Sequence, residues 1–77
     1  METVHIVQPF TRAARQGLMP KLAIQFKDPD EAIARAAAIA DKYAGVVAYS
    51  MDVDEDAGEY SDPRILLQLG DVPDLMG

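Results

Sequence analysis

The chain has 77 residues and a mass of 8.4 kDa, which suits one small domain spanning residues 1–77. It contains no cysteine, so disulfide scaffolds and thiolate metal sites are excluded. Apolar residues make up 49% of the chain, but 12 of them are Ala, only two are Phe and none is Trp. Such a core is marginal for a domain of this size, and it could be shared with a second copy of the chain.

Charge is distributed unevenly along the chain, whose net charge is −6. Residues 1–27 hold four basic residues and one acidic residue, whereas residues 28–77 hold three basic and twelve acidic residues. A net-acidic protein is repelled by nucleic acid and anionic lipid, so neither is expected as a partner. No apolar run approaches the ~20 residues of a membrane helix, and the N-terminus lacks the basic start of a signal peptide, so a cytoplasmic location is expected.

The first 27 residues predict a basic β-hairpin. Residues 3–10 are rich in β-formers and end near Pro9, which suits a strand end. A polar loop is expected over residues 11–20, punctuated by Gly and Pro. Residues 21–27 then alternate apolar and polar side chains, as a half-buried strand does.

A helix is predicted over residues 28–44. Asp28 can cap the first turn, Pro29 suits the first helical position and Gly45 can end the helix. The apolar side chains fall on one stripe at helical spacing: Ile33, Ala36, Ala37, Ala40, Tyr43 and Ala44. This face consists mostly of methyl groups, so the helix can approach a sheet closely.

Residues 45–69 predict a second β-hairpin, with strands over residues 45–53 and 64–69 and an acidic loop between them, and residues 70–77 predict an irregular tail. The expected fold is therefore α+β with the order ββαββ. It is a single layer of four mainly antiparallel strands with one Ala-rich helix packed on one face.

One helix leaves the other sheet face uncovered. The side chains expected under the helix are Leu22, Ile24, Phe26, Tyr49, Met51, Ile65 and Leu67. The outer face is then expected to present an apolar set that a sheet-to-sheet contact would bury: Val46, Ala48, Ser50 and Leu66, with Val7 and Ala23 beside them. Arg12 and Arg15 would add electrostatic contacts. These residues predict a non-enzymatic protein-interaction module that binds itself as a homodimer or docks on another protein, although scattered surface apolar side chains would give the same pattern.

Three carboxylates alternate in the acidic loop, as they do at the start of a calcium loop: Asp52, Asp54 and Asp56. The match then fails, because Ala57 and Pro63 stand where a calcium loop has Gly and Glu. A solvated acidic hairpin is the first interpretation. The alternative is a small-ligand or divalent-cation binder through residues 52–62.

Catalytic and cofactor chemistry is not expected. His5 is the only imidazole and no nucleophile motif accompanies it, while the glycines are isolated and form no phosphate-binding loop. Arg12, Arg15 and Lys21 could contact a phosphate or a nucleic-acid backbone. A solvated loop is the first interpretation of these residues, and an electrostatic contact with the acidic loop, within a dimer or with a partner, is the second. Tyr60 is either a surface anchor or a side chain packed over the hairpin.

Four segments resemble a group of short, uncharacterised bacterial proteins: Val7–Phe10, Gly45–Ser50, Gly58–Tyr60 and Asp71–Pro73. The similarity covers nearly the whole chain. Its motifs are structural rather than catalytic, and the group has no established activity. The resemblance therefore implies a bacterial cytoplasmic protein and transfers no site residues.

Overall fold

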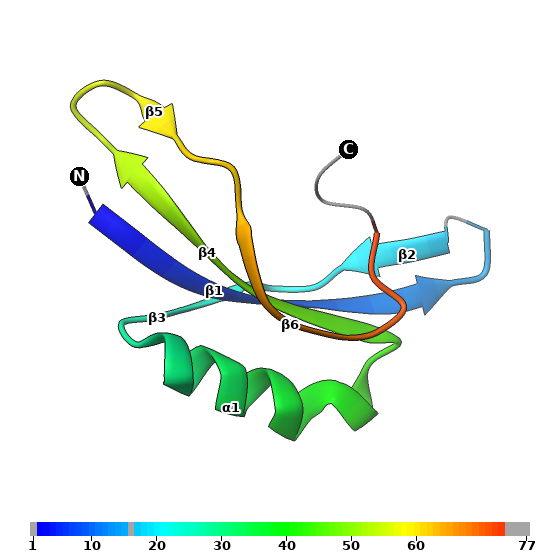
Figure 1. Cartoon of the computed structure of the whole chain (residues 1–77). Helices are drawn as coiled ribbons and strands as arrows, with labels where there is room; N and C mark the ends of the chain where they lie inside the picture. Colours follow the sequence, from blue (N-terminus) through cyan, green and yellow to red (C-terminus); the bar gives the residue numbers. More distant parts are fainter. Residues whose placement is uncertain (1, 16, 74–77) are drawn as a thin grey trace.

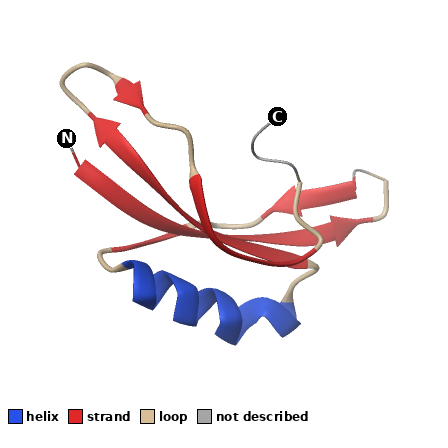
Figure 2. Cartoon of the chain, in the orientation of Figure 1, coloured by secondary structure: helices blue, strands red, loops and turns tan. Residues whose placement is uncertain are grey.

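A computed structural model describes residues 2–15 and 17–73. The elements in chain order are β1 (Glu2–Ala13), β2 (Gly17–Pro20), β3 (Ile24–Phe26), α1 (Pro29–Ile39), the 3₁₀ turn η1 (Ala40–Lys42), β4 (Gly45–Asp54), β5 (Glu59–Tyr60) and β6 (Arg64–Gly70). The fold is α+β, as predicted, with one antiparallel sheet and one α-helix in the described chain (Figure 2). No helix in that part of the chain is long and apolar enough to cross a membrane.

The two longest strands, β1 and β4, form the centre of the sheet. They pair antiparallel from Glu2–Val53 to Phe10–Gly45. Strands β2 and β3 both pair with the other edge of β1, while β5 and β6 both pair with the other edge of β4. Figure 1 shows that the two ends of this sheet curl away from α1, so the sheet resembles half of a barrel.

The prediction of four strands is wrong in detail, because each outer strand is divided into two. Residues 21–23 leave the sheet between β2 and β3, and residues 61–63 do the same between β5 and β6. Both predicted loops are also shorter than expected. Strand pairing continues to Ala13–Gly17 in the first hairpin and to Asp54–Glu59 in the second. Of the predicted irregular tail, residues 74–77 lie outside the described residues.

The start of the helix is formed as the sequence predicts. Asp28 is the N-cap, and its Oδ1 accepts a hydrogen bond from the Asp30 amide at 2.8 Å, while Pro29 opens the helix. The α-helix ends earlier than predicted, at Ile39, and η1 completes the segment. The buried residues of the α-helix are Ala32 and Ala36; Ala36 belongs to the predicted stripe and Ala32 does not, while Ala37 of that stripe is exposed.

The core lies between α1 and the sheet. Its fully buried members are Val7, Ala32, Ala36, Val46 and Ala48, and the partly buried side chains of Phe26, Ile39, Ala40, Tyr43, Leu66 and Leu67 pack around them. Three of the five fully buried residues are Ala. The helix therefore lies close to the strands, and the buried apolar area is small.

Two glycines hold the start of β4 against the end of β6. A Cβ atom added at Gly45 would lie 1.8 Å from the Asp71 carbonyl oxygen. Gly70 has a φ of +73°, and a Cβ atom added there would lie 2.4 Å from the Ala44 carbonyl oxygen. The Asp71 amide donates to the Ala44 oxygen at 2.9 Å. Only glycine permits this approach of two backbones. Further along β6 the register with β4 shifts between Ala48 and Tyr49, which is a β-bulge.

Gly45→Ala is expected to destabilise the fold by about 2–4 kcal/mol, because a methyl group at this position overlaps backbone atoms that cannot move independently. Urea unfolding gives this value, and hydrogen exchange should show lost protection of the Asp71 amide. Gly58→Ala is the matched control. Its new Cβ meets nothing within 4 Å, so it bears only the strain of a positive φ, roughly 1 kcal/mol, and leaves the Asp71 amide protected. Equal protection in the two variants would contradict the role of Gly45.

Candidate functional site

The sheet face opposite α1 is apolar, and we call it the concave face because the sheet curls around it (Figure 1). Strand register defines its members, since directly paired residues of antiparallel strands point to the same side. The apolar pairs are Val4–Met51, Ile6–Tyr49, Phe10–Gly45, Tyr49–Ile65 and Val53–Tyr60, and the same register places Gln8, Gln25 and Gln68 on this face. All of these alternate with the residues that pack under α1.

The concave face has a buried floor and an accessible rim. Val47 is fully buried and Phe10 is 4% exposed. Around them Ile6, Tyr49 and Met51 are half-buried, and their side chains remain partly in contact with solvent. Burial also raises the pKa of the Tyr49 hydroxyl.

On the concave face the large apolar side chains are most exposed on the two outer strands β5 and β6. Ile65 is 41% exposed and Tyr60 is 69% exposed. The face therefore presents two Tyr, one Met and two Ile side chains to solvent. Tyr and Met are enriched where proteins contact one another.

The predicted outer-face residues are on the wrong side of the sheet. Val46 and Ala48 are fully buried beneath α1, Ser50 is 3% exposed, and Leu66 packs against the helix-side core. The prediction that these four residues form an accessible interface is therefore wrong. Conversely, three side chains predicted to lie under the helix are on the concave face: Tyr49, Met51 and Ile65.

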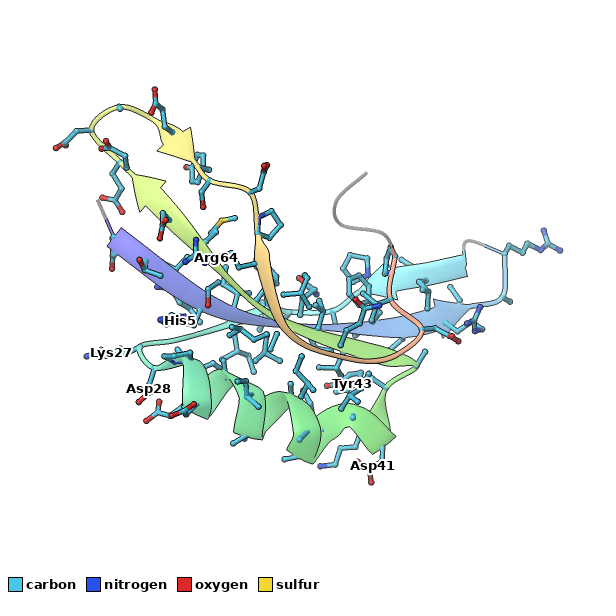
Figure 3. The ribbon with its side chains drawn as sticks, in the orientation of Figure 1. His5, Lys27, Asp28, Asp41, Tyr43 and Arg64 are labelled. Carbon is cyan, nitrogen blue, oxygen red and sulfur yellow. The ribbon has the colours of Figure 1, made fainter. Side chains whose placement is uncertain are left out.

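A buried hydrogen bond joins the two central strands on the helix side. The Ser50 Oγ lies 2.7 Å from Nδ1 of His5, its directly paired neighbour. Because Ser50 is 3% exposed, this hydrogen bond satisfies a polar group that is almost fully buried. Figure 3 places His5 toward the same end of the molecule as Asp28, away from Tyr43.

Asp52 connects three segments near the acidic end of the sheet. Its Oδ1 accepts a hydrogen bond from the Thr3 hydroxyl at 2.7 Å, and Arg64 donates to both carboxylate oxygens at 3.2 and 3.3 Å. Its backbone exchanges two further hydrogen bonds with Ser61. These contacts fix the segment between β5 and β6 to the central strands. The hydrogen bond from Thr3, followed by that from Arg64, lowers the pKa of Asp52.

The structure does not assemble a metal site from Asp52, Asp54 and Asp56, and that prediction is corrected. Asp52 is bound to Thr3 and Arg64, while Asp54 Oδ1 accepts from the Ala57 amide at 3.3 Å within the turn. Across residues 2–15 and 17–73, no group of three or more His, Cys, Asp or Glu side chains could hold a metal ion. A cavity of about 190 Å³ does lie beside the acidic strand end, lined by Asp52, Asp54, Glu59, Tyr60 and Ser61.

The two predicted arginine contacts differ in their surroundings. Arg12 forms an ion pair with Asp71, which ties the segment after β6 to the first hairpin. Arg15 lies beyond the end of β1 and is exposed. The concave-face residues were missed because each strand's alternation defines two faces without showing which one meets the helix.

Acid is expected to weaken the fold partly through Asp52. A carboxyl whose pKa is lower in the folded chain contributes stability above its unfolded pKa, about 3.9, and that contribution is lost as the pH falls through the folded value. Asp52→Asn should therefore be less stable than the wild type at pH 7, with a difference that shrinks toward pH 2. Thermal unfolding between pH 2 and pH 7 measures this.

Asp62→Asn is the matched control, since Asp62 is exposed and its carboxylate forms no hydrogen bond or ion pair within the described residues. Its stability difference from the wild type should be small at every pH. A pH-independent effect of Asp52→Asn would contradict the electrostatic role of Asp52.

No protein-family model matches this sequence, and no match is found among curated proteins or solved structures. The concave face and the charges around it are therefore the basis for inferring what the chain does.

Proposed function

We propose that the chain is a small, non-enzymatic protein-interaction module that binds another protein chain through the concave face. The observation that supports this most directly is an apolar sheet face with no helix over it. In the described part of the chain the only α-helix packs on the opposite side (Figure 2). An apolar face of this kind, rimmed by polar segments, is typical of a protein-binding surface.

The composition of the face supports a protein partner. Charged residues are absent from its centre, where the paired positions of β1 and β4 are Val4–Met51, Ile6–Tyr49 and Gln8–Val47. Depletion of charge at the centre, with aromatic and Met side chains enriched, distinguishes the core of a protein interface from ordinary surface. Tyr60 adds an exposed aromatic side chain of the type that often dominates binding energy.

The small core also favours this function. The buried hydrophobic residues of the described chain are Val4, Val7, Phe10, Ala32, Ala36, Val46, Val47 and Ala48, and only one of these is aromatic. Such a core gives limited stability to a 77-residue chain. Burial of the concave face against a partner would add apolar area and hence stability.

Photo-crosslinking in the cells that make the protein tests this function. Tyr60→p-benzoylphenylalanine places a benzophenone crosslinker on the concave face, and the larger side chain can be accommodated because Tyr60 is 69% exposed. It should form a discrete protein adduct on irradiation. Leu22→p-benzoylphenylalanine is the matched control, because Leu22 is 86% exposed but lies between β2 and β3 outside the face, and its adduct yield should be much lower.

A third variant connects the adduct to the concave face. Ile65→Glu, added to the Tyr60 variant, introduces a charge into the rim and should reduce the adduct yield at least tenfold. Circular dichroism checks that the variant folds. Equal yields from the Tyr60 and Leu22 variants, or no adduct from either, would overturn the proposed function.

A further inference from the structure

Opposite charges occupy the two hairpins at the ends of the sheet. The basic hairpin, residues 11–21, contains Arg12, Arg15 and Lys21 and no acidic residue, and of these Arg12 is paired with Asp71. The acidic hairpin, residues 52–62, contains six acidic residues and no basic one. Figure 1 shows these hairpins at opposite ends of the sheet, and both curve toward the concave side.

The neutral centre separates these two ends. Between the hairpins, the concave side chains of the central strands and β6 are uncharged: Val4, Ile6, Gln8, Phe10, Val47, Tyr49, Met51, Ile65 and Gln68. The chain is therefore polarised along its strands, with a basic hairpin, an apolar face and an acidic hairpin in succession. A partner that matches it needs the same three zones in reverse order.

A second copy of the chain supplies this reversed order. When two identical faces meet, the twofold axis that relates the copies lies between the faces. If this axis runs across the strands, each basic hairpin lies against the acidic hairpin of the other copy. An axis along the strands would instead oppose like charges, which is unfavourable. The first arrangement is self-complementary, as a closed twofold dimer requires.

The dimensions of the chain fit such a dimer. Its radius of gyration of 12.8 Å exceeds the roughly 11.5 Å expected of a compact 77-residue domain. Its accessible surface of 5195 Å² exceeds the roughly 4600 Å² expected of a compact monomer of 8.4 kDa. A stable interface needs about 800 Å² from each partner, a modest share of this surface.

We infer that the partner of the concave face is a second copy of this chain, docked face to face and antiparallel. Each acidic hairpin then lies against the basic hairpin of the other copy, with Tyr49, Met51 and Ile65 in the shared apolar centre. This inference rests on the proposed function, because it names the occupant of the same surface. It goes further by fixing the orientation of the two copies.

Light scattering after size exclusion tests the inference, with Arg15→Glu and Glu55→Lys as the charge reversals. Both residues are exposed and outside the strands, so the fold should be unaffected. The wild type should have a mass near twice 8.4 kDa. Each single variant should dissociate about tenfold more readily, because every homodimer of either variant contains two repulsive hairpin contacts.

An equimolar mixture of the two variants should recover the wild-type affinity to within about threefold, because both hairpin contacts then join opposite charges. High salt should reduce the differences in dimer affinity among the wild type, the two single variants and their mixture, because it screens the charges of the hairpins. Leu22→Glu is the control for adding a charge outside the face and should dimerise like the wild type, whereas Ile65→Glu should be monomeric.

The outcomes separate this inference from the proposed function. A monomer at every concentration, together with a Tyr60 crosslink to a different protein, would overturn the inference and leave the function intact. A dimer that neither reversal weakens, or that the mixture fails to restore, would overturn the antiparallel orientation. A monomer without any Tyr60 crosslink would overturn both proposals.

Discussion

The pairing of β1 with β4 is the constraint on which the rest of the structure depends. It runs without interruption from Glu2–Val53 to Phe10–Gly45, and every other strand attaches to the outer edge of one of these two. Its register also decides which side chains meet α1. A shift of one residue would exchange the two faces and move Tyr49 beneath the helix in place of Ala48. The methyl-lined helix and the small side chains beneath it are matched through this single register.

Much of the fold could be predicted from local signals. The Asp28 cap and the proline after it are encoded within a few residues, and the structure confirms them. Of the strand predicted over residues 21–27, the structure contains only Ile24–Phe26. The assignment of faces could not be predicted in the same way. In β4 both alternating sets are apolar, since Val46 and Ala48 are interleaved with Val47 and Tyr49. Over residues 46–51 neither set contains a charged residue that would mark the solvent side, so packing against α1 decides which face of β4 is buried beneath the helix.

The polar contacts were hidden from sequence analysis for a related reason. His5 and Ser50 are 45 residues apart in the chain, and Thr3 and Asp52 are 49 residues apart. Each pair meets only because β1 pairs with β4. The alternating carboxylates near Asp52 suggested ligands of a cation. In the structure Asp52 instead joins β1, β4 and the start of β6 through Thr3 and Arg64. A carboxylate with two such partners has little capacity left to bind an ion.

The bulge between β4 and β6 bears on how large an assembly can become. Among the described residues, no strand pairs with the outer edge of β6, and the side chains of this strand are mostly aliphatic. Such an edge is a usual template for the addition of further strands. The register shift at Ala48 and Tyr49 twists that edge, and an incoming straight strand could not follow its whole length. Growth into fibrils is thereby discouraged at the sheet edge, while the curved face stays free to close a finite complex.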